Sequence, residues 1–316
     1  MEDRFLKWLY ERMSFFKKPL LVGVGDDCAV LAPQKEKIVV TTDTILEEVH
    51  FKPDTSPEDV GYKAASVSLS DIAAMGAKPL VLFAAAALPY KHSGGYAKRI
   101  VEGILDALGM FGVQLAGGNY ALWSYPAAVT TTALGVSAKP LLRSGAKPND
   151  LICVTGSLGG SILEKHLRFT PRVNEALYLS QNYKINAMMD ISDGLALDLS
   201  RMMEASKTGC IIFESKLPIS EDAIRLSKKD GISPVRHALS DGEDFEILFT
   251  MPKQEAKRLL NDKKIRIPIS VIGEVSRERA MYFVRANGKK ERLKPEGYIH
   301  GKRVGDSLKR RDCRNW

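Results

Sequence analysis

The chain has 316 residues, of which 45% are hydrophobic and 27% are charged. This length suggests two domains, and this balance is typical of a soluble globular protein with a sizeable core. The formal net charge of +8 is compatible with nucleic acid, an anionic membrane surface or phosphorylated small molecules. The basic residues are densest from Lys289 to Arg314, without interleaved aromatic residues, which favours a solvated tail and argues against a nucleic-acid partner.

No segment resembles a targeting or membrane-spanning sequence. The longest apolar run, Leu80 to Leu88, is far shorter than the ~20 residues that span a bilayer, and the first residues lack a signal peptide's basic start. We therefore expect a cytoplasmic protein with no membrane partner. The cysteines lack metal-ligand spacing, which favours reduced thiols over a zinc site or a disulfide framework: Cys28, Cys153, Cys210 and Cys313.

The first predicted element is an amphipathic helix, because apolar residues recur at helical spacing: Phe5, Leu6, Leu9, Tyr10 and Met13. A glycine-rich turn then carries Asp26 and Asp27 into a strand. Taken alone, it is a turn whose aspartates bond their own backbone. It lacks the third glycine of a dinucleotide-binding fingerprint, and no P-loop pattern occurs in the chain.

The next strand leads to a concentration of oxygen-bearing side chains. Ile38 to Val40 is predicted as a buried strand, because consecutive β-branched residues suit a pleated surface. We expect this strand to end at Thr41, Thr42 and Asp43, and His50 follows seven residues after Asp43. Such a position suits a hard cation or a phosphate, whereas His50 taken alone could be a packed core histidine.

A long helix is predicted from Ser56 to about Met75. Ser56 is its N-cap, Pro57 occupies its first position, and Gly76 stops it. Alanine and serine dominate its surface, which allows a neighbouring backbone to approach closely. Asp71 lies in its interior, where aspartate is a poor helix former, and faces either solvent or a site.

The rest of the first half alternates between strands and helices. We expect strands at 81–88, 113–116 and 127–136, a helix at 95–112, and a glycine turn at 117–119 that presents the Asn119 side chain. The domain boundary is placed near residue 140. Arg143, in the basic turn after that boundary, could clamp a phosphate with two hydrogen bonds or be a lone surface arginine.

The second half opens with a strand at 151–155 and a glycine-rich stretch at 156–161, whose amides either bind an anion or simply connect strand to helix. A later apolar strand ends at Asp190, and Asp193 lies beside the start of a helix at 195–205. In the simplest reading, Ser192 or Asp193 is that helix's N-cap.

Four acids precede a further predicted strand: Asp241, Glu243, Asp244 and Glu246. A hairpin of type I′ is predicted at 286–289, and Tyr298 supplies a late aromatic residue.

Electrostatic repulsion limits how many of these acidic side chains can share one place. Two carboxylates about 4 Å apart repel by roughly 4 kcal/mol at an effective dielectric of 20, so five together would exceed a typical domain's stability unless cations neutralised them. Convergence of the acidic clusters therefore implies metal. Mg²⁺ is the expected ion, because it favours oxygen ligands and is normally shared between carboxylates and substrate phosphates.

Several long motifs occur in the order and spacing of the thiamine-monophosphate kinase family, part of the aminoimidazole ribonucleotide synthetase superfamily. The chain resembles that family in segments at 23–31, 41–44, 49–51, 62–77, 143–148, 190–195 and 242–250. The resemblance implies an α/β (α+β) fold of two domains. Residues 1–140 would form a sheet-and-helix domain that binds ATP and Mg²⁺ and pairs into a homodimer, and residues 141–316 an α/β domain that completes the substrate cleft.

The resemblance also implies direct transfer of the ATP γ-phosphoryl group to thiamine monophosphate, giving thiamine diphosphate and ADP. No catalytic side chain is expected, because phosphoryl transfer mainly needs positioning and charge neutralisation. By similarity, the Mg²⁺ ligands, direct or through water, are Asp27, Thr41, Thr42, Asp43, Asp71, Asn119, Asp190 and Asp193. The implied ATP contacts are Gly118, Asn119, Arg143 and Ser192, and the thiamine phosphate contacts are His50, Glu243 and Tyr298.

The chain departs from the family pattern in three places. Asn119 stands where the family has aspartate, and a neutral amide attracts Mg²⁺ less, so one metal site should be weaker. Residues 120–123 replace a polar segment of many relatives, and Asp241 stands where glycine is usual. Two alternatives stay open: another ATP-dependent enzyme of the superfamily with a different substrate, and a non-catalytic nucleotide- or RNA-binding descendant.

Overall fold

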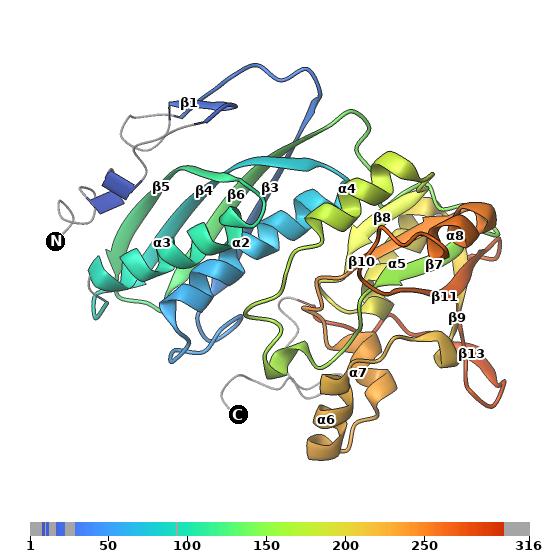
Figure 1. Cartoon of the computed structure of the whole chain (residues 1–316). Helices are drawn as coiled ribbons and strands as arrows, with labels where there is room; N and C mark the ends of the chain where they lie inside the picture. Colours follow the sequence, from blue (N-terminus) through green and yellow to red (C-terminus); the bar gives the residue numbers. More distant parts are fainter. Residues whose placement is uncertain (1–7, 10, 13–16, 23–28, 93, 300–316) are drawn as a thin grey trace.

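The structure is a computed structural model that describes residues 8–9, 11–12, 17–22, 29–92 and 94–299 (Figure 1). Trp8, Leu9, Glu11 and Arg12 are helical, and the other positions of the predicted N-terminal helix lie outside the described residues. So does Asp27. A short ribbon comes next, formed by β1 (Leu20–Val22) and β2 (Val30–Leu31).

A four-stranded sheet dominates the first half, in the order β3-β6-β4-β5. Its strands are β3 (Lys37–Leu46), β4 (Lys78–Pro89), β5 (Gln114–Trp123) and β6 (Ala128–Ser137). β6 is antiparallel to both neighbours, whereas β4 and β5 are parallel and are joined through a helix, as a parallel pair requires.

Two strands run further than the sequence predicts. β3 does not end at Thr41–Asp43, because it pairs with β6 along its whole length, from Lys37 opposite Ser137 to Leu46 opposite Ala128. The predicted turn at residues 117–119 is likewise wrong, since these residues continue β5 beside β4. The predicted polar residues therefore lie within the sheet rather than in loops at its edge.

Helices α2 (Pro57–Ala74) and α3 (Gly94–Gly109) both lie across one face of this sheet (Figure 1). The predicted start and stop of α2 are confirmed: Ser56 accepts a hydrogen bond from the Asp59 amide at 3.1 Å, and Gly76 adopts φ of +58°. The two helices pack backbone to backbone, because a Cβ atom at Gly61 would lie only 1.9 Å from the Ile100 carbonyl oxygen.

A seven-stranded sheet forms the second half, in the order β13-β12-β9-β11-β7-β10-β8. Its strands are β7 (Leu151–Thr155), β8 (Ala187–Asp190), β9 (Gly209–Phe213), β10 (Ile247–Met251), β11 (Ile269–Ser276), β12 (Met281–Val284) and β13 (Lys290–Arg292). The helices are α4 (Val173–Asn182), α5 (Leu195–Ser206), α6 (Glu221–Asp230), α7 (Pro234–Ser240) and α8 (Lys253–Leu260), with 3-10 turns η1 (Ser161–Leu163) and η2 (Glu214–Lys216). The predicted strand at 151–155 and the predicted helix start at Leu195 are confirmed.

The two sheets share a hydrophobic core. Along β7 and β10, alternate residues such as Cys153 and Phe249 join the buried cluster that contains α2 and α4, whereas Ile152 and Leu248 join a second cluster beneath α5. The central strands of the second sheet are thus buried on both faces, and α2 runs from the first sheet to the second (Figure 1). This shared core brings the end of β8 against α2.

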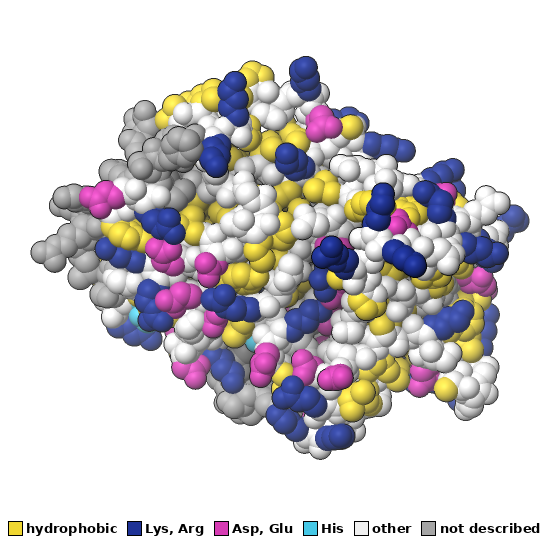
Figure 2. Space-filling view, viewed as in Figure 1, with side chains coloured by type: hydrophobic (Ala, Val, Ile, Leu, Met, Phe, Trp, Pro, Cys, Tyr) yellow, Lys and Arg dark blue, Asp and Glu magenta, His cyan; other side chains and the backbone are white. Residues whose placement is uncertain are grey.

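None of the described helices is both long and apolar enough to cross a membrane. On the face shown in Figure 2, basic side chains are spread over both halves of the molecule, with acidic side chains between them.

Candidate active site

Three carboxylates from different elements converge where α2 meets the second sheet. Asp43 lies on β3, Asp71 on α2 and Asp190 at the end of β8. The side chains of Asp43 and Asp71 are hydrogen-bonded to each other, and the charge of Asp71 also acts on Asp190. The expected convergence therefore holds for these three residues.

Hydroxyl groups hold these carboxylates in place. Thr41 Oγ1 donates to Asp71 Oδ2 at 2.5 Å, Ser68 Oγ donates to Asp43 Oδ2 at 3.0 Å, and Ser70 Oγ donates to Asp190 Oδ2 at 2.7 Å. Ser68 and Ser70 belong to the small-residue surface of α2, whose serines the sequence showed only as packing residues. The available signal was two serines close to Asp71 in the chain, three residues and one residue before it.

The pKa values of the three carboxyl groups are consistent with a binding site for a hard cation. Burial and the nearby Asp71 charge raise the pKa of Asp43 to about 6 and that of Asp190 to about 8, and burial raises the pKa of Asp71. Anionic carboxylates at this site are therefore costly unless a cation neutralises them. In the described ranges no three His, Cys, Asp or Glu side chains could hold a metal ion by themselves, so waters and phosphate oxygens would have to complete the coordination of Mg²⁺.

Arg143 lies on the same side of the molecule as the carboxylates. Its charge acts on both Asp71 and Asp190, and its own side chain is exposed, so it can meet an anionic ligand. Its carbonyl oxygen accepts a hydrogen bond from Ser206 Oγ at 3.2 Å, which ties the turn to α5.

Asp193 follows Asp190 by three residues, but its carboxylate is paired with Arg201. Arg201 Nη1 lies 2.5 Å from Asp193 Oδ2 and 2.7 Å from Asp198 Oδ1. The N-cap of α5 is Gly194, and neither Ser192 nor Asp193 caps the helix with its side chain. Instead the fully buried Asp198 accepts both backbone amides, from Ser192 at 3.1 Å and from Asp193 at 2.9 Å, a role that sequence reasoning missed.

Thr42 and Asn119 lie on the other face of the sheet. Thr42 Oγ1 pairs with Thr132 Oγ1 at 2.9 Å, on the side away from α2, because successive strand residues point to opposite faces. Asn119 is opposite Ala85, which in turn is opposite Thr130, so Asn119 also faces away from Asp43. The structure thus does not bring these two predicted ligands to the three carboxylates.

Gly118 lies in the sheet row that contains Asp43, since Asp43, Thr131, Ala84 and Gly118 are successive cross-strand partners. A Cβ atom at Gly118 would lie 1.9 Å from the Ala84 carbonyl oxygen. Only glycine therefore fits here.

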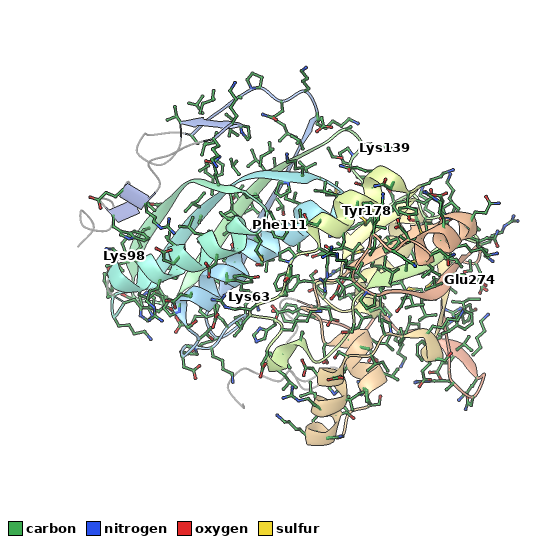
Figure 3. All side chains as sticks on the ribbon, in the orientation of Figure 1. Lys63, Lys98, Phe111, Lys139, Tyr178 and Glu274 are labelled. Carbon is green, nitrogen blue, oxygen red and sulfur yellow. The ribbon has the colours of Figure 1, made fainter. Side chains whose placement is uncertain are left out.

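Two of the residues predicted to bind thiamine phosphate, His50 and Glu243, contact Lys63 of α2, which is labelled in Figure 3. Lys63 Nζ lies 2.6 Å from Glu243 Oε1 and 2.8 Å from the His50 carbonyl oxygen. Tyr298 is joined to the neighbourhood of the carboxylates through its amide, which donates to the Asp193 carbonyl oxygen at 2.9 Å. His50 and Glu243 are thus brought together, and Tyr298 lies beside Asp193.

The glycine-rich stretch at 156–161 serves the protein itself. The Gly159 amide donates to Asp244 Oδ1 at 2.8 Å and the Gly160 amide to Asp241 Oδ2 at 3.0 Å. These contacts favour the connecting role over anion binding. They also give the Asp241 carboxylate a structural role, since it contacts His237 Nδ1 at 2.9 Å as well.

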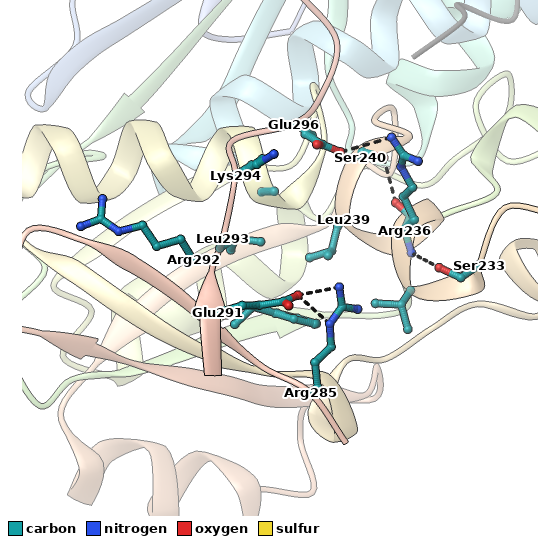
Figure 4. A pocket seen from close by; sticks show the side chains of 13 residues that line it. Ser233, Arg236, Leu239, Ser240, Arg285, Glu291, Arg292, Leu293, Lys294 and Glu296 are labelled. Atoms are coloured by element: carbon teal, nitrogen blue, oxygen red, sulfur yellow. Dashed lines mark hydrogen bonds and ion pairs between the residues drawn. The ribbon is translucent and has the colours of Figure 1, made fainter. Parts of the chain in front are cut away.

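A hollow of about 460 Å³ lies between α7 and the β12–β13 hairpin, within the usual size range for ligand sites (Figure 4). Two of the three arginines that line it are paired with acids: Arg285 with Glu291 at 2.6 Å and Arg236 with Glu296 at 3.5 Å. None of the three converging carboxylates lines it. We therefore do not assign it to the candidate active site.

The two-sheet fold and the carboxylate site between its halves define a class of protein, and comparison with known families identifies that class. Residues 25–137 match the family described as AIR synthase related protein, N-terminal domain, and residues 133–285 match the corresponding C-terminal domain. The predicted two-domain fold of this superfamily is thereby confirmed.

Curated relatives narrow the class. Thiamine-monophosphate kinase of Rhodopirellula baltica is 39% identical over 311 residues, covering 95% of this chain and 98% of the relative. The corresponding protein of Bacillus subtilis is 34% identical over 309 residues, covering 89% of this chain and 94% of the relative. The chain belongs to the thiamine-monophosphate kinase family.

Solved structures agree. Thiamine-monophosphate kinase from Stenotrophomonas maltophilia K279a superposes with a TM-score of 0.79 at 28% identity, covering 90% of this chain and 96% of that one. AaThiL complexed with AMPPCP and TMP superposes with a TM-score of 0.75 at 28% identity, covering 93% and 95%. Hydrogenase maturation protein HypE in complex with ATP, at 20% identity and a TM-score of 0.77, shares the fold alone.

Proposed function

We propose that this chain transfers the γ-phosphoryl group of ATP to thiamine monophosphate, producing thiamine diphosphate and ADP. The observation that carries the proposal is the convergence of Asp43, Asp71 and Asp190 from three separate elements. The choice of substrates is supported by the family and by the AaThiL complex with AMPPCP, an analogue of ATP, and TMP. Because the reaction consumes ATP, we place it in the cytoplasm.

In this proposal Asp43, Asp71 and Asp190 hold Mg²⁺, directly or through water, with Thr41 beside them. The bound ion would neutralise the phosphate oxygens during in-line transfer. Thr41, Ser68 and Ser70 fix the orientation of the carboxylates through the hydrogen bonds described above. Asp27, which lies outside the described residues, and Asp193 stay proposed ligands on the basis of the family resemblance.

The nucleotide would be held by groups around the same cluster. Arg143 is exposed and acts on two of the carboxylates, so it can form charge-assisted hydrogen bonds with a phosphate. Gly118 lets a ligand approach the strand closely, and the Ser192 main chain is fixed by Asp198. No side chain needs to act as a base, because the acceptor is already an anionic phosphate.

The acceptor would bind at His50, Glu243 and Tyr298. Burial opposes ionisation of Glu243, but Lys63 and His166 outweigh it and hold the pKa of Glu243 at about 2. The resulting carboxylate complements the cationic thiazolium ring of thiamine. Tyr298 would contribute its aromatic ring, which is partly exposed.

We further propose that the chain forms a homodimer through the sheet face that α2 and α3 leave open. Ile38 and Val40 are each 58% exposed on this face, so the predicted burial of this strand is wrong for both, whereas Val39 between them packs against the core on the other face. Exposed β-branched residues on a flat sheet face mark an interaction surface. Thr42 and Asn119 lie on this same face, so a dimer would bring any ligand they bind close to the subunit interface.

The test is to mix the purified chain with ATP, Mg²⁺ and thiamine monophosphate and to follow thiamine diphosphate and ADP by chromatography. The proposal expects both products in equal amounts, and none without Mg²⁺. ATP consumption without thiamine diphosphate would favour another enzyme of the superfamily. ATP binding without any turnover would favour the non-catalytic descendant.

A further inference from the structure

Lys63 is a fully buried lysine with a complete set of partners. Its side chain is 0% exposed, and its Nζ atom lies 2.6 Å from Glu243 Oε1, 2.8 Å from the His50 carbonyl oxygen and 3.1 Å from His166 Nδ1. An ammonium group has three N–H donors, so these contacts account for all of them. A lysine enclosed in this way is fixed in position and charge.

The ion pair with Lys63 orients the Glu243 carboxylate. Glu243 lies between α7 and β10 with φ of +54°, a conformation that is uncommon outside glycine, and its amide donates to the Ser192 carbonyl oxygen at 2.7 Å. Its side chain is 29% exposed, so the carboxylate is reachable from solvent while Lys63 holds it from below.

His50 is fixed at two points by the same neighbourhood. Its carbonyl oxygen accepts from Lys63, and its ring Nδ1 accepts from the Leu46 amide at 3.0 Å. The proton of a neutral His50 is therefore on Nε2. Lys63 thus joins a turn after β3 to a loop before β10, which belong to different sheets.

His166 completes the cluster. It is 8% exposed, and its Nδ1 lies 3.1 Å from Lys63 Nζ and 3.5 Å from Glu243 Oε2. Lys63 therefore makes the shorter of the two contacts with the Glu243 carboxylate, at 2.6 Å compared with 3.5 Å for His166.

We propose that Lys63 is a positioning residue for the acceptor, which holds Glu243 and His50 in the arrangement that binds thiamine monophosphate. This inference rests on the proposed function. Lys63 lies eight residues before Asp71 on α2, about 12 Å along the helix axis. Substitution of Lys63 should therefore weaken the binding of thiamine monophosphate much more than the binding of ATP.

The experiment measures steady-state kinetics of Lys63→Met, with Lys253→Met as a matched control. Lys253 also pairs with a glutamate, Glu274 at 3.4 Å, but on the surface. For Lys63→Met we expect the KM for thiamine monophosphate to rise by about tenfold or more, since the Glu243 carboxylate loses the cation that holds it, while the KM for ATP stays within about twofold. Lys253→Met should leave both constants unchanged. An unchanged KM for thiamine monophosphate, or equal increases for both substrates, would overturn the inference.

A double variant protects the test against misfolding. Lys63→Met combined with Glu243→Gln removes both charges of the pair, so no Glu243 carboxylate is left without its cationic partner. If Lys63 acts through Glu243, the double variant has about the same KM for thiamine monophosphate as Glu243→Gln alone. Multiplicative effects of the two substitutions would show independent roles and contradict the inference.

Binding measurements separate this inference from the proposed function. If the wild-type chain forms no thiamine diphosphate, the proposed function fails. Calorimetric titration with thiamine monophosphate still decides the role of Lys63: weaker binding to Lys63→Met than to the wild type supports it. Equal binding, or no binding to the wild type, overturns it.

Discussion

Two acidic side chains just before β10, Asp244 and Glu246, have pKa values shifted in opposite directions. Glu246 is buried, which opposes its ionisation, but Arg172 and Lys165 outweigh burial and lower its pKa. Asp244 is also buried, and only one of its oxygens has a partner, the Gly159 amide, so burial raises its pKa to about 8. The difference lies in the partners and not in the depth of burial.

The Asp244 carboxyl should make stability depend on pH. Its folded-state pKa of about 8 lies above the ordinary value of 3.8, so the folded chain keeps a proton that the unfolded chain loses. Stability from this group is fully present below about pH 4 and is lost as the pH rises through about 8. We expect Asp244→Asn to remove this loss.

The measurement is urea unfolding of Asp244→Asn and the wild type at several pH values. The free energy of unfolding of the variant, relative to the wild type, should rise by on the order of 4 kcal/mol between about pH 5 and pH 9, since about three pH units separate pH 5 from the folded-state pKa. A difference that stays constant over this range would refute the raised pKa.

Glu246→Gln should destabilise the fold strongly. Glu246 Oε1 lies 2.7 Å from Lys165 Nζ and 2.7 Å from Arg172 Nη2, and its side chain is 1% exposed. Removing its charge leaves two cations without their buried partner, which costs about 3–5 kcal/mol of unfolding free energy. The matched control is Glu274→Gln, because its partner Lys253 is half exposed, and its effect should stay below about 1 kcal/mol. Equal small effects of both variants would count against the network.

Single residues also show where sequence reasoning stops. The acids near Asp241 were visible as a cluster, but their partners Lys165 and Arg172 are more than 70 positions away in the chain, so no local pattern could pair them. Asp43, Asp71 and Asp190 were predictable as a group because each lies in a strong local context. Asp198 was not, because it looks like an ordinary helical aspartate until its contacts with two amides are seen.

At the scale of elements, the predictions succeeded where local chemistry is decisive. The start of α2 follows from Ser56 and Pro57, and β7 follows from a run of apolar residues between turn signals. The end of β3 did not follow, because the change from the apolar Ile38–Val40 to the polar Thr41–Asp43 resembles a strand end in sequence. The threonines of β3 continue the strand through hydroxyl contacts with β6, such as Thr44 Oγ1 to Thr130 Oγ1 at 2.9 Å, a partner 86 residues away.

Asn119 provides a test at this scale, since its place inside β5 fixes which way its side chain points. Asn119→Asp should change the Mg²⁺ concentration needed for half-maximal activity by less than about twofold, because Asn119 faces away from the three carboxylates, whereas a ligand at this position would bind Mg²⁺ more tightly as a carboxylate. The measurement is activity against Mg²⁺ concentration, with Asn261→Asp as a surface control at the end of α8. A Mg²⁺ requirement that falls several-fold in Asn119→Asp alone would restore Asn119 as a ligand and contradict this placement.

At the scale of the whole molecule, one core joins the two sheets, and the sheet face away from α2 is covered in part by the β1–β2 ribbon through Leu20 but stays exposed at Ile38 and Val40. α2 carries Lys63, Ser68, Ser70 and Asp71 in a single element, so the acceptor contacts and the carboxylate cluster are held by one rigid helix. The sequence indicated two halves, but the sharing of their core depends on contacts between distant segments and was not predictable from local patterns.

If the exposed sheet face around Ile38 and Val40 forms the dimer interface, a single charged residue placed there should disrupt the dimer. Val40→Asp should shift the chain from dimer to monomer, because a carboxylate would be buried in the interface without a partner. Because Val40 is exposed in the single chain, the fold itself should be little affected. Sedimentation velocity gives the mass, with Ile224→Asp on the surface of α6 as the control. A wild-type chain that is already monomeric, or an intact Val40→Asp dimer, would contradict this interface.

The central claim is that carboxylates from β3, α2 and β8 share one divalent-cation site with a nucleotide. Anomalous diffraction from crystals grown with Mn²⁺, in place of Mg²⁺, and a non-hydrolysable ATP analogue tests it most directly. We expect an anomalous peak within coordination distance of Asp71 and at least one of Asp43 and Asp190, shared with the phosphate oxygens. Bound nucleotide with no peak near these three side chains would contradict the account.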